Sequence, residues 1–405
     1  MSPGLRAKRV FLTGASGFIG ARLAECLTRA YGAEVNALVR RPGTVGVARL
    51  ARLAGVRLYQ GDVRDADAVD RASRGCSLFI HCATGTSGSR RERVAVTVEG
   101  IRIVIEAAMR HGAERIVYFS SAAVHDPARS GEVIREESPL NGAALAREKI
   151  LAEGLLAAYQ RKFGLPVVIV RPTCVWGPFS PIWTISAVEL VRAQVPLLPL
   201  NGLGASNLVH IDNLVDAVVL ALTEGAAVGQ TFLINDDEPR TWADLYGGYS
   251  RFLQVPLRFL SESHGSGQML KVSLYNTGLI LGNVLRGRIT VARLPREVYD
   301  HVPAAKVLVS LLPEAVKRRL QQSEMAQKTT PGFSGPPAGS RVSFLPYNVV
   351  PRPTLELYGS RSRYSNEKAK QVLGWWPRRS FDEALAVTCQ WLQYAGYAPS
   401  VASIL

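Results

Sequence analysis

Three glycines near the start of the chain have the spacing of a phosphate-binding turn. The segment 13–20 reads TGASGFIG, follows the strand-like run RVFLT and opens a helical pattern. Glycines let a backbone turn sharply and approach a pyrophosphate, and the N–H groups that begin the next helix favour an anion. We therefore predict a dinucleotide site. Its contacting residues in this segment are Gly14, Ser16, Gly17, Phe18 and Ile19.

Two arginines stand where the second strand is expected to end. Arg40 and Arg41 follow the apolar run 34–39. A carboxylate at this position would accept hydrogen bonds from the ribose hydroxyls of NAD, whereas guanidinium groups can bind a 2′-phosphate. The pair thus favours NADP as the cofactor. NAD with two solvated arginines is the alternative interpretation.

The elements that must position these residues alternate in a regular way. Up to about Val175, short β-branched runs alternate with helical patterns, which is typical of βαβ units around a parallel sheet. We predict an α/β fold: a Rossmann-type doubly wound parallel sheet with a smaller C-terminal substrate lobe. The expected strands are 9–13, 34–39, 56–59, 78–81, 115–120 and 167–170.

Later segments are expected to complete this sheet and to add the second lobe. The runs 207–211 and 230–235 are predicted to be strands that return to the sheet, with a helix over 213–222 between them. The predicted dinucleotide-binding domain is 1–178, completed by 206–236. The predicted substrate-binding lobe is 179–205 and 237–405.

A basic insert stands apart within this lobe. Residues 265–345 hold eleven Lys or Arg against four acidic residues. Parts of it mix Leu and Val with Lys and Arg, as interfacial helices do. Peripheral membrane contact is one hypothesis for the insert, and ordinary solvated helices packed on the lobe are the other.

Composition narrows the class of protein. The 405 residues are 47% apolar and 20% charged, as in an ordinary folded protein. The net charge of +15 favours anionic partners, but no nucleic-acid-binding signature accompanies it. The five cysteines are scattered without metal-ligand spacing, so we expect no metal and a reducing compartment. We find neither a secretory segment nor an 18-residue apolar run, and therefore expect a cytoplasmic protein.

Several segments beyond the glycine turn resemble the extended short-chain dehydrogenase/reductases, the NAD(P)-dependent epimerase/dehydratase group of sugar-nucleotide enzymes. The resemblance covers nearly the whole chain. Its segments are GDV (61–63), IHCA (80–83), YFSS (118–121), RPTCVWGP (171–178), VHIDN (209–213) and RYSNEKAK with LGW (363–375). It implies further cofactor contacts from Asp62 and Val63 at the adenine, Ala83 and Thr84 at the ribose and pyrophosphate, Lys149 and Pro172.

The resemblance also implies a catalytic site, with one important departure. The family uses a Tyr-x-x-x-Lys pair, in which the lysine lowers the pKa of a phenol that exchanges a proton with substrate. Ser121 matches the residue that orients the substrate oxygen, and Lys149 matches the lysine, but the tyrosine position is Leu145. Thr97 stands where the family often has the Asn of a proton relay. The Tyr-x-x-x-Lys string at 364–368 is interpreted as a chance match.

His125 is the candidate to replace the missing phenol. It follows Ser121 by four residues, and an imidazole titrates in the right range to act as an acid or base. A polar loop residue without a catalytic role is the alternative interpretation.

Two functions remain open from the sequence. The first is an epimerase/dehydratase-like or reductase-like enzyme that acts on a nucleotide sugar or related polar alcohol or ketone through a non-standard proton donor. The second is an NADP-binding protein without net redox activity, either a repurposed lyase or cyclase or a cofactor sensor. The resemblance further implies a homodimer that forms through the helices 96–110 and 143–162.

Overall fold

The computed structural model describes residues 5–85, 89–126, 131–142, 146–194, 198–259 and 352–397, with side chains from 356 onward in the last range. The predicted basic insert 265–345 and the Leu145 position lie outside the described residues. No helix in the described ranges combines the length and apolar character needed to cross a bilayer.

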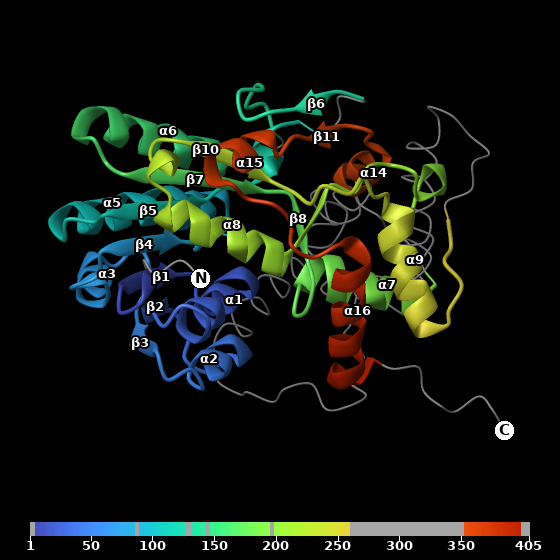
Figure 1. Cartoon of the computed structure of the whole chain (residues 1–405), viewed down its shortest axis with the longest axis horizontal. Coiled ribbons are helices and arrows are strands. Elements are labelled where there is room, and N and C mark those ends of the chain that lie inside the picture. The colour runs from blue at the N-terminus through green and yellow to red at the C-terminus, as the bar shows by residue number, and fades with distance from the viewer. Residues whose placement is uncertain are drawn as a thin grey trace, which may run out of the picture.

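A parallel sheet of seven strands forms the centre of the molecule (Figure 1). Its order is β10-β7-β5-β4-β1-β2-β3, and every neighbouring pair is parallel. The strands are β1 (Arg9–Thr13), β2 (Glu34–Val39), β3 (Val56–Gln60), β4 (Leu78–His81), β5 (Arg115–Phe119), β7 (Val167–Pro172) and β10 (Thr231–Ile234). This confirms the predicted doubly wound α/β fold.

Helices cover both faces of this sheet, because successive strand residues point to opposite sides. One face packs against α1 (Phe18–Arg29), α2 (Val45–Leu50), α8 (Ile211–Thr223) and α15 (Glu367–Leu373). The opposite face packs against α3 (Ala66–Ser73), α5 (Gly100–Arg110) and α6 (Arg147–Phe163).

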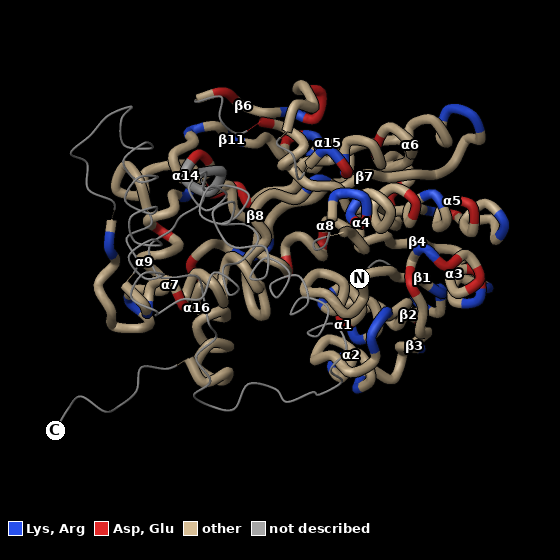
Figure 2. Tube along the Cα trace, turned by 180° about the vertical axis from the view of Figure 1, so that it is seen from behind, with Lys and Arg blue, Asp and Glu red and all other residues tan. Residues whose placement is uncertain are grey.

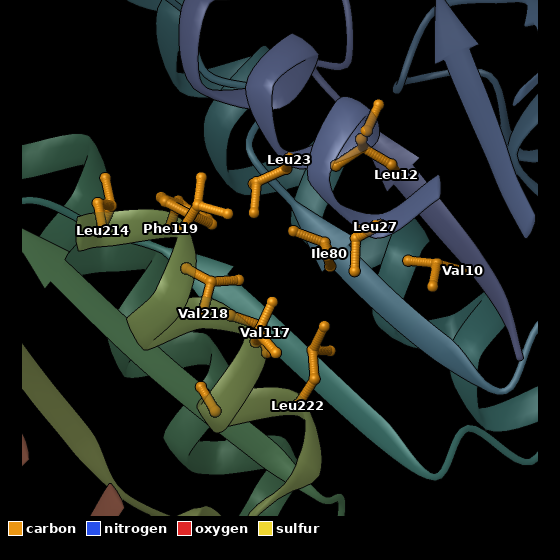
Figure 3. Close-up of a cluster of buried hydrophobic side chains, with 14 of the residues drawn as sticks. Val10, Leu12, Leu23, Leu27, Ile80, Val117, Phe119, Leu214, Val218 and Leu222 are labelled. Atoms are coloured by element: carbon orange, nitrogen blue, oxygen red, sulfur yellow. The ribbon is translucent and has the colours of Figure 1, made fainter. Parts of the chain in front are cut away.

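The first of these two cores shows why the sequence folds this way. Leu23 and Leu27 of α1 approach the sheet beside Leu214 and Val218 of α8 (Figure 3). All four side chains are fully buried against alternate residues of the central strands, such as Ile80. Burying each such side chain stabilises the fold by about 1.5–3 kcal/mol.

A separate aromatic core lies beyond the carboxyl ends of the strands. The chain leaves β7 at Pro172 and continues at once into β8 (Cys174–Trp176), which leads away from the sheet toward α7, α9 and α16 (Figure 1). Trp176, Trp242 and Tyr246 are fully buried in this second core. The helices concerned are η5 (Pro181–Ser186), α7 (Ala187–Arg192), α9 (Trp242–Leu253), α14 (Arg352–Gly359) and α16 (Phe381–Leu392).

Two short parallel pairs lie outside the main sheet. β6 (Val133–Ile134) pairs with β11 (Arg363–Tyr364), and β8 pairs with β9 (Leu208–His210). The prediction that 207–211 returns to the main sheet is therefore wrong, whereas β10 confirms the prediction for 230–235. The error arose because a short apolar run shows that a strand forms but not which strand it pairs with.

The helix expected over 96–110 is also divided. It consists of a π-helical turn, η2 (Ala95–Glu99), and α5, and the separate helix α4 (Arg90–Val94) precedes it. The π-helical turn holds Thr97, which is buried and faces the end of β4. Single π-helical turns are frequent at functional sites.

Candidate functional site

The glycine turn joins β1 to α1 by a backbone path that side chains would block. Gly14 has φ +69°, and a Cβ there would lie 2.7 Å from the backbone nitrogen of Ala83. A Cβ at Gly20 would lie 2.3 Å from the carbonyl oxygen of Gly14. The turn therefore lies directly against the loop after β4, and only glycine permits both contacts.

The start of α1 has the electrostatic character of an anion site. Gly17 is its N-cap, no side chain caps the helix, and the first turn holds no acidic residue. The first N–H groups of such a helix are without intrahelical partners and carry the positive end of the helix dipole. A pyrophosphate group fits this position.

A cavity of about 330 Å³ opens at this turn, along the carboxyl ends of β1, β2 and β4. It has the size of a small-ligand pocket or of part of a larger site. Eight predicted cofactor residues line it: Gly14, Ser16, Gly17, Arg40, Asp62, Val63, Ala83 and Thr84. Further lining residues that the sequence analysis missed are Thr13, Leu38, Gly61, Cys82 and Val96.

Five other predicted cofactor residues do not line this cavity. Phe18 and Ile19 pack against the apolar core with α1. Arg41 is exposed beside Arg40, and Pro172 is buried in the sheet, where it pairs with β10. Lys149 is buried behind the cavity, at the ends of β4 and β5.

Charges at the β2 and β3 end of the cavity are arranged around Asp62. Arg64 binds both carboxylate oxygens of Asp62, at 2.8 and 2.9 Å. Burial opposes ionisation, but the hydrogen bond from Arg64 is the larger influence, and with the charge of Arg40 it lowers the pKa of Asp62. Arg40 is exposed at the end of β2 and borders the same cavity. This end of the site thus holds the guanidinium groups of Arg40 and Arg64 beside the single carboxylate of Asp62.

Three threonines hold the loop after β4 in place. The Thr13 hydroxyl contacts His81 Nδ1 at 2.9 Å and accepts a hydrogen bond from the Ala83 backbone at 3.3 Å. The Thr97 hydroxyl accepts from the Gly85 backbone at 3.0 Å and lies 3.2 Å from the hydroxyl of Thr84. Thr97 therefore fixes the cavity wall. The family resemblance already drew attention to this position, where the family often has an Asn.

Lys149 is a buried cation near the cavity, and its pKa departs strongly from the ordinary value of a lysine. Its ammonium donates to the Phe119 carbonyl and lies 4.9 Å from the centre of the Tyr118 ring. Burial lowers the pKa of Lys149 to about 8, although the neighbouring Cys82 and Glu153 counteract part of this effect. The pKa of this amine therefore lies closer to neutral pH than that of an exposed lysine.

Ser121 and His125 flank the short 3-10 turn η3 (Ala122–Val124) after β5. Ser121 is partly exposed, and its hydroxyl accepts a hydrogen bond from the Ala123 backbone at 3.2 Å. His125 is only 1% exposed. Its Nδ1 lies 3.2 Å from the Pro139 carbonyl, and its Nε2 lies 3.2 Å from Arg171.

These contacts define the state of His125. Nδ1 carries the proton that bonds the Pro139 carbonyl, and Nε2 accepts from the guanidinium of Arg171. Burial, and then the charge of Arg171, lower the pKa of His125. Both ring nitrogens are thus occupied by protein groups, and we do not propose His125 as the proton donor.

A buried ion pair connects this region to the lysine helix. Arg171 on β7 donates to Glu153 with both sides of its guanidinium, with a distance of 3.0 Å from Nε to Oε1. Both side chains are 5% exposed. Glu153 lies one turn after Lys149 on α6, so the pair holds α6 against the sheet at the level of the lysine.

Comparisons with known proteins agree with this geometry. Residues 10–235, more than half of the chain, match the NAD dependent epimerase/dehydratase family. A dihydroflavonol 4-reductase of Zea mays is 32% identical over 55% of this chain and 68% of its own length. A dTDP-glucose 4,6-dehydratase of Streptomyces niveus is 29% identical over 54% of this chain and 70% of its own.

Solved structures show the same fold at lower identity. A UDP-glucuronic acid 4-epimerase from Bacillus cereus, in complex with NAD, aligns over 96% of this chain and 99% of its own, with a TM-score of 0.64 and 14% identity. A dTDP-glucose 4,6-dehydratase from Streptomyces venezuelae, with NAD bound, covers 96% and 98%, with a TM-score of 0.63 and 20% identity. This chain belongs to the NAD dependent epimerase/dehydratase family.

Proposed function

We propose that this protein is an NADP-dependent enzyme that reduces, oxidises or epimerises a polar ketone or alcohol, with a nucleotide sugar as the substrate class. The observation that carries the proposal is Arg40, which borders the dinucleotide cavity at the end of β2, where NAD-binding sites hold a carboxylate. The names of the relatives agree with a carbonyl substrate, since one is a reductase and another a sugar-nucleotide dehydratase.

Each part of the cavity has a binding role in this proposal. The N–H groups of Phe18 and Ile19 at the start of α1 bind the pyrophosphate, while the N–H of Gly17 donates to the Gly14 carbonyl within the turn. Arg40 and Arg41 bind the 2′-phosphate. NADP, when bound, supplies hydride chemistry at its nicotinamide ring.

The rest of the cavity positions the two nucleosides. Asp62 and Val63 border the adenine, while Ala83 and Thr84 follow the ribose and pyrophosphate. The lobe predicted over 179–205 and 237–405 would hold the substrate beyond the carboxyl ends of the strands. This placement is general for ligands of open α/β sheets.

We further propose that Lys149 carries the proton that a tyrosine carries elsewhere in the family, with Ser121 as the hydrogen-bonding partner of the substrate oxygen. The support is a buried ammonium whose pKa is about 8. Since Lys149 is buried and does not line the cavity, the proton would pass between its amine and the substrate oxygen through the Ser121 hydroxyl, toward the substrate in reduction and toward the amine in oxidation.

The pH dependence of turnover tests this role. Reduction requires the protonated lysine, so kcat should fall as pH rises through about 8, and oxidation should show the opposite trend. A Lys149→Arg variant keeps the positive charge but does not titrate in this range. Its remaining activity should lose the transition near pH 8, and an unchanged profile would refute the role of Lys149.

Consumption of NADPH in the presence of sugar nucleotides and simple ketones tests the function itself. The rival proposal is an NADP-binding protein without net redox activity, and the observation that favours it is Leu145 at the phenol position. Tight NADP binding with no product from any substrate, and no change in Ser121→Ala, would favour this rival. Product formation that depends on Ser121 would favour the enzyme.

Two further expectations from the sequence stay proposals. Homodimers would form through α5 and α6, where Met109 and Leu151 are exposed. Sedimentation of a Leu151→Glu variant tests this, because a charge at the interface should dissociate the dimer.

Liposome co-sedimentation tests the proposed membrane contact by residues 265–345. An absence of liposome binding at low salt would refute that contact.

A further inference from the structure

A groove beside α1 and α2, separate from the dinucleotide cavity, has no assigned role. It encloses about 750 Å³ between these two helices and the C-terminal helix α16 with the turn η9 (Gln393–Tyr397) that follows it. The loop Pro178–Phe179 and the start of α8 form its base. None of its lining residues lines the dinucleotide cavity.

The charges on the α1 and α2 side of the groove are only partly compensated. Arg49 binds both oxygens of Glu25, with 2.6 Å from Nη2 to Oε2, and Arg22 binds Asp212 at 2.7 Å. Arg29 and Arg52 also line the groove, are exposed, and have no acidic partner within 4.0 Å among the described residues. Figure 2 shows basic segments on both α1 and α2. The two uncompensated guanidinium groups favour an anion.

The other side of the groove is aromatic. Phe179 packs between the guanidinium of Arg49, 4.0 Å from its ring centre, and the ring of Trp391, 4.7 Å between centroids. Tyr394 lines the same groove and is 92% exposed. Flat apolar side chains beside cations are the surfaces on which bases and similar rings stack.

The backbone of Phe179 supports a functional interpretation. Its φ is +70°, in the left-handed region that a bulky residue rarely adopts. Such a conformation is unfavourable and persists only where the surroundings hold it. Here Arg49 and Trp391 hold the ring on the groove wall instead of in the core.

We propose that this groove is a second ligand site, which binds a nucleoside phosphate. The base stacks against Trp391 and Tyr394, and the phosphate lies between Arg29 and Arg52. The volume suits a mononucleotide, since ligand pockets enclose about 300–1,000 Å³. The site goes beyond the proposed function, because it shares no residue with the dinucleotide cavity and needs no reaction there.

Calorimetric titration of the full chain with UMP tests the proposal. NADPH is present at saturation, and UMP is chosen because adenine nucleotides would compete for the dinucleotide cavity. We expect Arg29→Glu/Arg52→Glu to weaken UMP binding at least tenfold. The matched control Arg6→Glu/Arg161→Glu reverses two exposed arginines that line neither cavity, and should bind UMP as the wild type does.

Two further measurements separate stacking from charge. Trp391→Phe should retain UMP binding, whereas Trp391→Leu should weaken it several-fold, because only the former keeps a ring to stack on. Uridine and inorganic phosphate, titrated singly, should each bind at least tenfold more weakly than UMP. Circular dichroism confirms that each variant folds.

Three results would overturn the proposal. One is the absence of UMP binding to the wild type at millimolar concentrations. Another is unchanged UMP affinity in Arg29→Glu/Arg52→Glu, which would place the nucleotide in the substrate site instead. The third is a change of oligomeric mass in that variant without a change in UMP affinity, which would make the groove a contact between copies of the chain. None of these measurements depends on turnover, so the proposed catalytic function can fail while the proposed groove site stands, and the reverse is also true.

Discussion

The dinucleotide cavity and the buried cluster of Lys149, Glu153 and Arg171 beside it are built by different means. The first consists of backbone, glycines and residues at strand ends, from Gly14 to Thr84. The second consists of buried side chains from distant segments, in which Lys149, Glu153 and Arg171 meet beside β5 and β7. A site built mainly from backbone groups can bind the same ligand whatever reaction follows. A cluster of buried charges, in contrast, is destabilised when any one of its members is removed.

The largest expected effect is a fall in kcat on substitution of Lys149, in the buried cluster. Lys149→Met removes the ammonium with little change in volume, and kcat should fall by about 10²–10⁴-fold, the usual worth of a positioned proton-transfer group. NADP affinity and the melting temperature, measured in parallel, should change far less. A variant that retained wild-type kcat would show that another group carries the proton.

The next effect is on stability. Arg171→Met leaves Glu153 buried without its partner, which should reduce the free energy of unfolding by about 3–5 kcal/mol. The double variant Arg171→Met/Glu153→Met removes both charges and should recover much of this loss. Urea denaturation of the two variants measures the difference, and equal losses would mean that the pair matters only through its packing.

A smaller effect is expected at the dinucleotide cavity. Arg40→Asp should shift preference from NADP toward NAD by about 10–100-fold, because a charge-assisted contact to phosphate contributes about 1.5–3 kcal/mol and a carboxylate repels the phosphate. Equilibrium titration with both cofactors measures the ratio. Arg57→Asp, a substitution of an exposed arginine on β3 outside the cavity, is the matched control.

The smallest effect concerns acid stability at the same cavity. The folded-state pKa of Asp62 lies below its unfolded value, so its contribution to stability is present at neutral pH and is lost as pH falls through the folded pKa. Arg64→Ala should reduce the contribution, by less than about 1 kcal/mol, because Arg64 is 44% exposed. Urea midpoints should differ between variant and wild type at pH 7 and converge at low pH; a constant difference would contradict this explanation.

The two regions also differ in how far the sequence predicted them. The glycine turn and Arg40 were predicted from spacing and strand order, and Asp62 and Ala83 from the family resemblance; all of them line one cavity. Thr13 and Cys82 line it too but were missed as cofactor residues. Glycine and strand-end patterns identify contacts made by the backbone, while contacts made by neighbouring side chains need the packing of the loops.

His125 illustrates this limit. Its position four residues after Ser121 suggested a proton donor, and nothing in the sequence indicated that Arg171, 46 residues away, would occupy its second nitrogen. The pairing of β9 with β8 was missed for the same reason. Both depend on long-range neighbours that a local pattern does not specify.

Local patterns in the chain were enough to predict the doubly wound sheet, the glycine turn and the cationic end of the second strand, because the periodicity of apolar residues and the conformational freedom of glycine act locally. The environment of Lys149, the burial of His125, and the groove between α1, α2 and α16 became visible only in the folded molecule. Burial and charge compensation depend on which distant side chains meet, and their energies arise only when those side chains are brought together.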